Sequence, residues 1–200
     1  MIISKGFPDS DRSRIAALYW EAFGAKLGRT MGPAPKALRF FETVLYPPHA
    51  ICARDADGTL LGVAGFKTAE GALVGGTFRD MARVYGWLGA GWRVALLLAL
   101  ERDSENARFL MDGIFVEPAA RGCGVGTLLL QAIADEAAAR GYAEVRLDVI
   151  DSNARARALY ERRGFRAVRT HSTGVLRHVF GFRSATTMVL RVTRGHVPSC

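Results

Sequence analysis

The sequence has 200 residues, of which 50% are hydrophobic and 23% are charged, and its formal net charge is +8. This length and composition are typical of one ordinary α/β domain with a sizeable core, and they exclude a disordered chain and a chain embedded wholly in a membrane. The positive charge favours an anionic partner, but the sequence contains no linear basic stripe, so we expect no nucleic acid.

Residues 1–45 predict a short strand followed by two amphipathic helices. The strand begins at Ile2, and Asp9 or Ser10 is expected to cap the first helix. The apolar residues of that helix fall on one face: Ile15, Leu18, Tyr19 and Phe23. Two prolines then interrupt the chain, Pro33 and Pro35. The second helix is marked by Leu38, Phe41, Val44 and Leu45.

A β-hairpin and an insertion come next. The β-like runs 50–54 and 59–66 flank Asp55-Ala56-Asp57-Gly58, which is a strong hairpin signal. Residues 67–107 are predicted as an insertion with helical character. The insertion forms either a pair of helices on the core or on a second subunit of a homodimer, or a lid or wall of a substrate site.

The insertion contains an apolar run that must be distinguished from a membrane span. Residues 84–100 are apolar, but the run is shorter than the ~20 residues that a bilayer needs. It also contains Arg93 and is interrupted by glycines. We therefore expect no membrane span.

The chain is organised around a glycine-rich turn. A β-rich run, Phe109–Val116, precedes the turn, and the apolar-periodic segment Thr127–Arg140 follows it as a helix. The turn itself reads Arg121-Gly122-Cys123-Gly124-Val125-Gly126. Glycines lack the Cβ atoms that would keep a ligand off the backbone, so successive N–H groups converge on one anion, and the helix adds the positive end of its dipole. The turn therefore predicts a pyrophosphate site, with Arg121 supplying a formal charge.

A second strand and helix complete this central stretch. The strand is predicted over 144–150, and Asp151-Ser152-Asn153 caps a helix that runs to Arg163 and ends at Gly164.

The C-terminal part of the chain predicts the last strands of the sheet. These strands are expected over 166–170 and 185–192, and residues 193–200 are expected to form a loose tail. His171 and His178 lie in this region. A lone histidine is more often a hydrogen-bonded structural residue than a catalyst, so neither is assigned to the site.

Other phosphate-binding motifs fit the turn less well. A Rossmann loop requires G-x-G-x-x-G, but position 127 is Thr, although Asp148 lies at a suitable distance for its acid. A Walker loop requires a Gly-Lys pair, which does not follow here. The remaining alternative is a tight turn without a ligand.

Two motifs together resemble the acyl-CoA-binding core of the GNAT superfamily of N-acetyltransferases. The first is Val116-x-Pro118-x-x-Arg121-x-x-Gly124-x-Gly126, and the second is Asn153-x-x-Ala156-x-x-Leu159-Tyr160-x-x-x-Gly164-Phe165. They occur in the family's order and separation and cover somewhat over a quarter of the chain. The resemblance implies an α/β (α+β) fold with a central mixed, mostly antiparallel sheet flanked by helices. The insertion departs from the family pattern, in which the third strand turns back quickly into the fourth.

The resemblance also implies which residues hold acetyl-CoA. Strand residues would guide the pantetheine arm, the turn would bind the pyrophosphate, and Asn153 would hold the arm from the other side. The implied cosubstrate-binding residues are Ile114, Phe115, Val116, Arg121, Gly122, Cys123, Gly124, Val125, Gly126, Thr127, Asn153 and Tyr160.

Acyl transfer to an amine requires a base and an acid. Asp148 occupies the position at which some family members carry a catalytic glutamate, and Asp112 and Glu117 are the second and third candidates; the alternative for Asp148 is an ordinary outward-facing carboxylate. Tyr160 matches the family tyrosine that protonates the leaving thiolate, and the alternative is a core aromatic residue.

The sequence thus predicts an N-acetyltransferase that moves an acetyl group from acetyl-CoA directly to a primary amine. A small-molecule amine, a peptide N-terminus and a lysine all fit as acceptor. Cys123 lies in the phosphate turn, far from the thioester, so no covalent intermediate is expected. The alternative function is a non-catalytic acyl-CoA-binding regulatory module, which would keep the turn without needing Tyr160 and Asp148.

Residues 1–192 are predicted as a single domain of a cytoplasmic protein. The odd cysteine count without paired spacing is typical of reduced thiols, namely Cys52, Cys123 and Cys200. No secretory signal is visible at the N-terminus, and no metal site is expected.

Overall fold

A mixed sheet runs through the computed structural model, which describes residues 1–100, 109–174 and 181–192. Within these residues the sheet has eight strands in the order β1-β2-β3-β5-β6-β8-β7, and β4 pairs with β3. The only parallel pair among them is β5 with β6; the other pairs are antiparallel. The strands are β1 (Ile2–Lys5), β2 (Ala50–Arg54), β3 (Leu60–Thr68), β4 (Gly71–Ala72), β5 (Phe109–Val116), β6 (Glu144–Ile150), β7 (Arg166–Ser172) and β8 (Ser184–Arg191).

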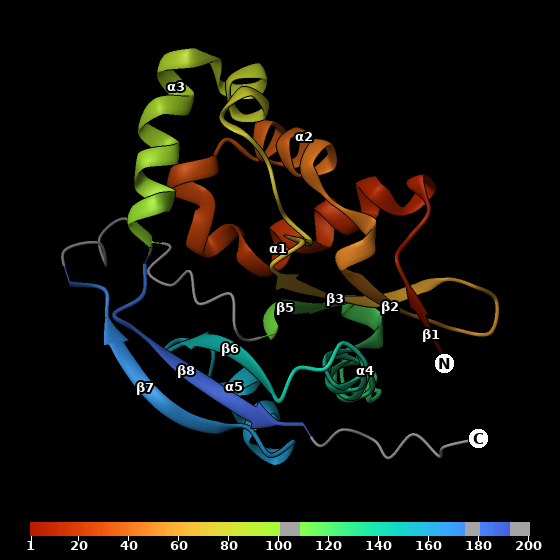
Figure 1. Ribbon diagram of the computed structural model, residues 1–200. Coiled ribbons are helices and arrows are strands. Elements are labelled where there is room, and N and C mark those ends of the chain that lie inside the picture. The colour runs from red at the N-terminus through yellow and green to blue at the C-terminus, as the bar shows by residue number, and fades with distance from the viewer. Residues whose placement is uncertain (101–108, 175–180, 193–200) are drawn as a thin grey trace.

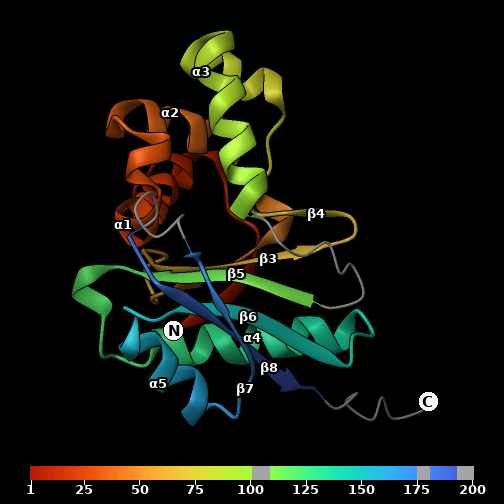
Figure 2. The same cartoon turned by 90° about the vertical axis from the view of Figure 1, so that its left-hand side faces the viewer.

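Helices cover both faces of this sheet (Figures 1 and 2). Three of them lie on one face and two on the other, and each group packs on its own apolar cluster. The first group is α1 (Arg12–Met31), α2 (Ala34–Val44) and α3 (Phe78–Leu100), and the second is α4 (Val125–Ala139) and α5 (Ala154–Arg162). The architecture confirms the predicted mixed, mostly antiparallel sheet with flanking helices.

The first helix begins later than the sequence indicated. Asp9 and Ser10 belong to a short 3-10 helix, Asp9–Asp11, and α1 starts at Arg12. The carboxylates that could cap it are engaged elsewhere, because Asp9 binds the Arg12 guanidinium and Asp11 pairs with Arg54 of β2. The predicted apolar face is correct, with Ile15 and Leu18 fully buried.

Helix α2 tolerates a proline that was expected to interrupt the chain. Pro33 is its N-cap residue, and Pro35 lies in the first turn, where a helix N–H has no intrahelical partner in any case. The buried face of α2 consists of Ala37, Phe40, Phe41 and Val44.

The insertion is helical, as predicted, but it starts two residues later than expected because β3 continues to Thr68. Helix α3 bends at Gly86, whose φ of 74° and ψ of 164° are not helical. Met81, Tyr85 and Ala90 bury this helix against α1 and α2. Among the described residues no helix is both long and apolar enough to cross a membrane. Residues 101–107 of the predicted insertion, His178 and the tail 193–200 lie outside the described residues.

A bulge at Asp112 reverses the side-chain alternation of β5. Gly65 of β3 pairs with Gly113, whereas the next residue, Phe66, pairs with Met111, so Asp112 is the extra residue. Met111 therefore packs in the α4 cluster, whereas Phe115 packs in the α1 cluster. The bulge turns Asp112 and Gly113 toward α1, where a Cβ on Gly113 would lie 2.4 Å from the Phe23 ring.

Candidate active site

Strands β5 and β6 part after two paired positions. Phe109 pairs with Val145 and Leu110 pairs with Arg146, and no further pair between the two strands occurs. Strand β6 nevertheless remains paired with β8 along its whole length. The backbone groups of residues 111–116 that face β6 are consequently not used by the sheet. Apart from the Val116 carbonyl, which accepts from Arg121, they form an open hydrogen-bonding edge of the kind that an extended ligand can occupy.

The glycine turn lies between the end of this edge and the start of α4. Gly122 and Gly124 have φ values of 90° and 84°, and a Cβ at either position would meet nothing within 4 Å. The turn is braced by Cys123, whose N–H donates to the Ala120 carbonyl at 3.3 Å. Because a helix leaves its first N–H groups unpaired, Val125, Gly126 and Thr127 of α4 present donors at this end. The turn is thus an open cradle suited to an anion.

Arg121 is held by two contacts that the sequence did not indicate. Its Nε donates to the Val116 carbonyl at 3.1 Å, and its Nη2 forms an ion pair with Glu21 of α1 at 2.5 Å. The guanidinium therefore fastens the end of β5 to α1 as well as standing beside the turn. Neither residue type nor spacing links Glu21 to Arg121, which lies 100 positions away.

The Tyr160 side chain lies beneath the sheet, in the α4 cluster. It is 8% exposed and its ring centroid is 5.8 Å from that of Phe165. Burial raises the pKa of Tyr160 to about 12. Among the described residues the hydroxyl makes no hydrogen bond, so it remains available to a ligand.

Asn153 caps α5, as the sequence predicted. Its side-chain oxygen accepts a hydrogen bond from the Ala156 N–H at 3.1 Å. Asn153 is exposed, and the helix cap uses its side-chain oxygen but not its NH₂ group. Asn153 therefore can fix the helix and still donate to a ligand.

The two aspartates lie on the face of the sheet opposite Tyr160. Leu147 and Val149 of β6 are buried against α4, so Asp148 between them points to the α1 face. Thr187 of β8 donates to the Asp148 carboxylate at 2.5 Å, and the Arg146 guanidinium lies 3.5 Å from it. These contacts fix the direction of the carboxylate.

Asp112 reaches the same face through the bulge. The phenol of Tyr19 in α1 is buried, and its pKa is raised by that burial and by the negative charge of Asp112. Asp112 is therefore close to Tyr19. Glu117, the third candidate, lies at the start of the turn and forms a bidentate ion pair with Arg14 of α1.

Sequence patterns could have indicated some of these partners. The period-2 alternation of β6 places Arg146 beside Asp148 on one face. The contact of Thr187 with Asp148 could be predicted only from the register of β8 against β6. The proximity of Tyr19 to Asp112 could be predicted only from the bulge in β5. Among the described residues no group of three His, Cys, Asp or Glu side chains could hold a metal ion.

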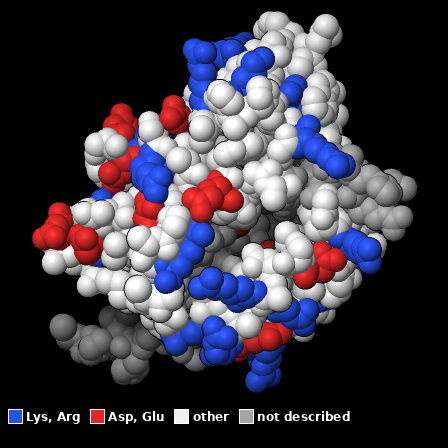
Figure 3. Space-filling model, turned by 180° about the vertical axis from the view of Figure 1, so that it is seen from behind, with Lys and Arg blue, Asp and Glu red and all other residues white. Residues whose placement is uncertain are grey.

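Basic side chains gather near α5. Four exposed arginines lie on or next to this helix: Arg155, Arg157, Arg162 and Arg163. Viewed from behind, Lys and Arg side chains crowd the lower part of the molecule, with Asp and Glu interspersed (Figure 3). This distribution forms no continuous stripe on the face shown.

A family model described as the acetyltransferase (GNAT) family matches residues 12–165. The chain belongs to this family. GNAT proteins are acetyl-CoA-dependent N-acetyltransferases, so the resemblance seen in the sequence is confirmed.

A solved structure shares the fold of this chain, and two curated proteins are similar to parts of it. The crystal structure of an N-acetyltransferase from Staphylococcus aureus Mu50 superimposes with a TM-score of 0.64 and 14% identity, covering 95% of this GNAT chain and all of that chain. Mycothiol acetyltransferase of Beutenbergia cavernae is 47% identical over 57 residues, 28% of this chain and 19% of its own length. Streptothricin acetyltransferase of Streptomyces lavendulae is 34% identical over 84 residues, 42% of this chain and 44% of its own length. The matches thus span less than half of either curated relative.

Proposed function

We propose that this GNAT protein transfers an acetyl group from acetyl-CoA directly to a primary amine. The observation that carries the proposal is the parting of β5 and β6 beside an open glycine cradle at the start of α4. The cradle fits a pyrophosphate, and the free edge at residues 111–116 fits the amide groups of pantetheine. An N–H of that edge would also stabilise the oxyanion of the tetrahedral intermediate.

The acceptor must lose a proton before it attacks. An alkyl amine with a pKa of about 10 is neutral in only about one molecule in 10³ at pH 7, so a base accelerates the reaction. Asp148 is the preferred base because Thr187 and Arg146 orient its carboxylate. Asp112 is the second candidate on the same face.

The leaving thiolate requires a proton donor. The amine nitrogen bonds to the thioester carbon and forms the tetrahedral intermediate. When its oxyanion collapses to the carbonyl, the carbon–sulfur bond breaks and the sulfur takes the electron pair. Tyr160, whose phenol is protonated at neutral pH, would donate its hydroxyl proton from the face opposite the aspartates. The base carries away the proton of the amine, and no atom of the enzyme is acetylated.

The second candidate function is a non-catalytic acyl-CoA-binding module. The placement of Asp148 and Tyr160 on the two faces beside one gap favours the enzyme, because binding alone needs neither group. We also propose a cytoplasmic location, which is supported by the absence of a disulfide at Cys52 and Cys123, the two cysteines that the structure describes.

The test is thiol release from acetyl-CoA in the presence of a panel of primary amines, with the acetylated product identified by mass spectrometry. We expect amine-dependent release of CoA. Tight binding of acetyl-CoA with no product from any amine in the panel would favour the binding module.

A further inference from the structure

A cavity of about 620 Å³ lies between the helices and the sheet on the α1 face. Helices α1 and α2 form one side, α3 of the insertion forms another, and the segment from β3 through β4 forms the floor and rim. Its volume is in the range of sites that enclose a small organic molecule. The cavity-lining apolar side chains include Leu27, Met31, Phe40, Met81, Val94 and Leu98.

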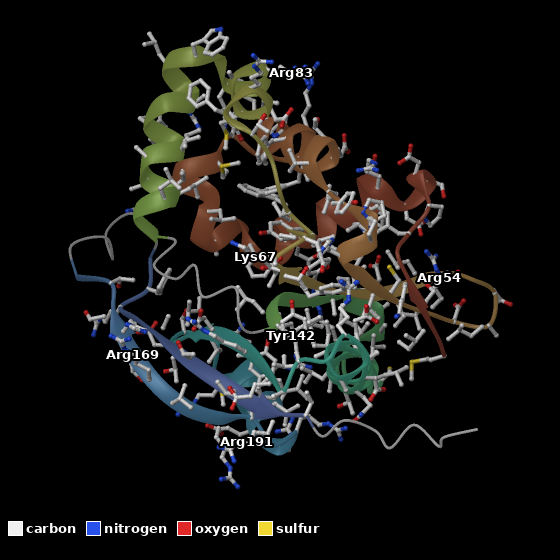
Figure 4. All side chains as sticks on the ribbon, in the orientation of Figure 1. Arg54, Lys67, Arg83, Tyr142, Arg169 and Arg191 are labelled. Atoms are coloured by element: carbon white, nitrogen blue, oxygen red, sulfur yellow. The ribbon has the colours of Figure 1, made fainter. Side chains whose placement is uncertain are left out.

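The floor of this cavity reaches the place where β5 and β6 part. Lys67, a floor residue, pairs with Leu110 of β5, and Leu110 pairs with Arg146 at the last position that joins the two strands. Figure 4 shows Lys67 between the helices and the central strands. Tyr19 also lines the cavity and interacts with Asp112 at the bulge. An acceptor in the cavity would therefore have its amine directed toward the gap.

The lining selects by polarity as well as by shape. Most of the walls are apolar, and the two charged residues of the lining, Lys67 and Glu70, have opposite sign and lie on β3 and the turn that follows it. A second ammonium group on the acceptor would lose its hydration against the apolar side chains. An apolar group would instead be removed from water at a favourable free energy.

We propose that the acceptor is a primary amine joined to a bulky, uncharged apolar group, and that this group occupies the cavity between α1, α2, α3 and β4. The proposal rests on the proposed acetyl transfer and names its substrate class. An arylalkyl amine and the N-terminus of a peptide that begins with Leu or Phe share this chemistry.

The first experiment compares kcat/KM within matched amines. Phenethylamine and hexylamine should exceed ethanolamine and 1,4-diaminobutane at least tenfold, and a peptide beginning with Phe should exceed one beginning with Asp if the natural acceptor is a peptide. Equal or better use of the polar amines would overturn this inference and leave acetyl transfer intact. Failure with every amine would overturn the proposed function.

The second experiment places a charge on the cavity wall. Leu98 lines the cavity and is 62% exposed, so Leu98→Glu is compatible with the fold; Leu88, 92% exposed on the same helix, does not line it. Leu98→Glu should raise KM for phenethylamine at least fivefold, lower KM for 1,4-diaminobutane, and leave KM for acetyl-CoA unchanged. Leu88→Glu is the control and should change none of these.

A third variant tests whether filling the cavity reduces binding of the amine. Gly75 lines the cavity, and a Cβ there would meet nothing within 4 Å, as is also true of Gly91 outside the cavity. Gly75→Leu should reduce binding of phenethylamine, measured by calorimetry with CoA present, whereas Gly91→Leu should not. Identical amine affinity in both variants and the native protein would show that the cavity is not the acceptor site, whether or not the protein is an enzyme.

Discussion

Tyr160 illustrates how burial sets the chemistry of a single residue. Its pKa of about 12 keeps the phenol protonated across the working pH range. Tyr160→Phe removes the hydroxyl and little volume, so acetyl-CoA affinity should persist while kcat falls by about 10²–10⁴-fold, as is typical for loss of a general acid. Tyr142→Phe is a matched control, because Tyr142 packs on Phe109 in the same apolar cluster. An unchanged kcat in Tyr160→Phe would assign this residue to packing alone.

Asp148 should be tested through the pH dependence of the rate. Asp148→Asn should lower the rate chiefly at neutral pH, with partial recovery as pH rises toward the amine pKa of about 10, because the free amine then needs no base. The measurement is kcat/KM from pH 6 to 10. Wild-type rates across this range would transfer the role to Asp112 or to a water chain.

The glycine cradle offers a test with a closely matched control. Gly124 and Gly58 both have φ of 84°, and a Cβ at either position would meet nothing within 4 Å. Valine should therefore strain both sites by a similar roughly 1–2 kcal/mol, but only Gly124→Val should abolish acetyl-CoA binding in calorimetry. A folded Gly124→Val protein with native affinity would refute the pyrophosphate assignment.

Gly126 requires a different argument from Gly124. It lies within α4 with ordinary helical geometry, and an added Cβ would approach the Leu159 side chain at 3.3 Å. Any effect of Gly126→Val would therefore combine contact with α5 and contact with the ligand. The sequence could not distinguish the two glycines, because spacing alone does not reveal φ.

At the scale of elements, local patterns predicted most of the sheet. The predicted bounds of β2, β5 and β6 agree with the structure, because each is a run of β-forming residues between strong turn signals. The predicted start of α1 was wrong because Asp9 and Ser10 belong to a short 3-10 helix, in which Asp9 binds the Arg12 guanidinium. The bulge at Asp112 was not predicted either, since it depends on pairing with β3 across an insertion.

The contact between α4 and β1 at Glu136 predicts how the stability of the fold depends on pH. Glu136 of α4 is almost fully buried and contacts Lys5 of β1 and Arg140. Burial alone would raise the pKa of Glu136, but the hydrogen bonds from Lys5 and Arg140 outweigh it, so the net pKa is lowered. A lowered carboxylate pKa stabilises the fold above the unfolded value of about 4.3, and this stability is lost as pH falls through the folded value.

Glu136→Gln should consequently lower the free energy of unfolding by about 1–3 kcal/mol at pH 7. The difference from the native protein should shrink as pH falls below the unfolded value of about 4.3, because the native carboxylate is protonated as pH falls through its lowered pKa. Urea unfolding at pH 7 and pH 3.5 measures both quantities. Glu161→Gln, in an exposed pair with Arg157, serves as the control and should change stability by less than about 0.5 kcal/mol. A difference that stays constant with pH would exclude the ionic explanation.

At the scale of the whole molecule, the gap divides the sheet into two parts. Strands β1, β2, β3 and β5 form one part, and β6, β8 and β7 form the other. Two paired positions and the cluster under α4 join them. The proposed cosubstrate would lie across this division, with its pyrophosphate at the turn and its arm against β5.

Hydrogen exchange can examine the two parts of that ligand separately. ADP carries the pyrophosphate without the arm, so it should protect amides 122–127 only, whereas pantetheine should protect amides 111–116 only. CoA should protect both segments, because their open donors would then bind ligand oxygens, and β1, at the far edge of the sheet, should not change. Protection by CoA of neither segment, with binding verified by calorimetry, would place the cosubstrate elsewhere on the molecule. Protection of both segments by ADP alone would instead indicate that binding at the turn also orders β5. The pantetheine arm would then not be needed to protect residues 111–116.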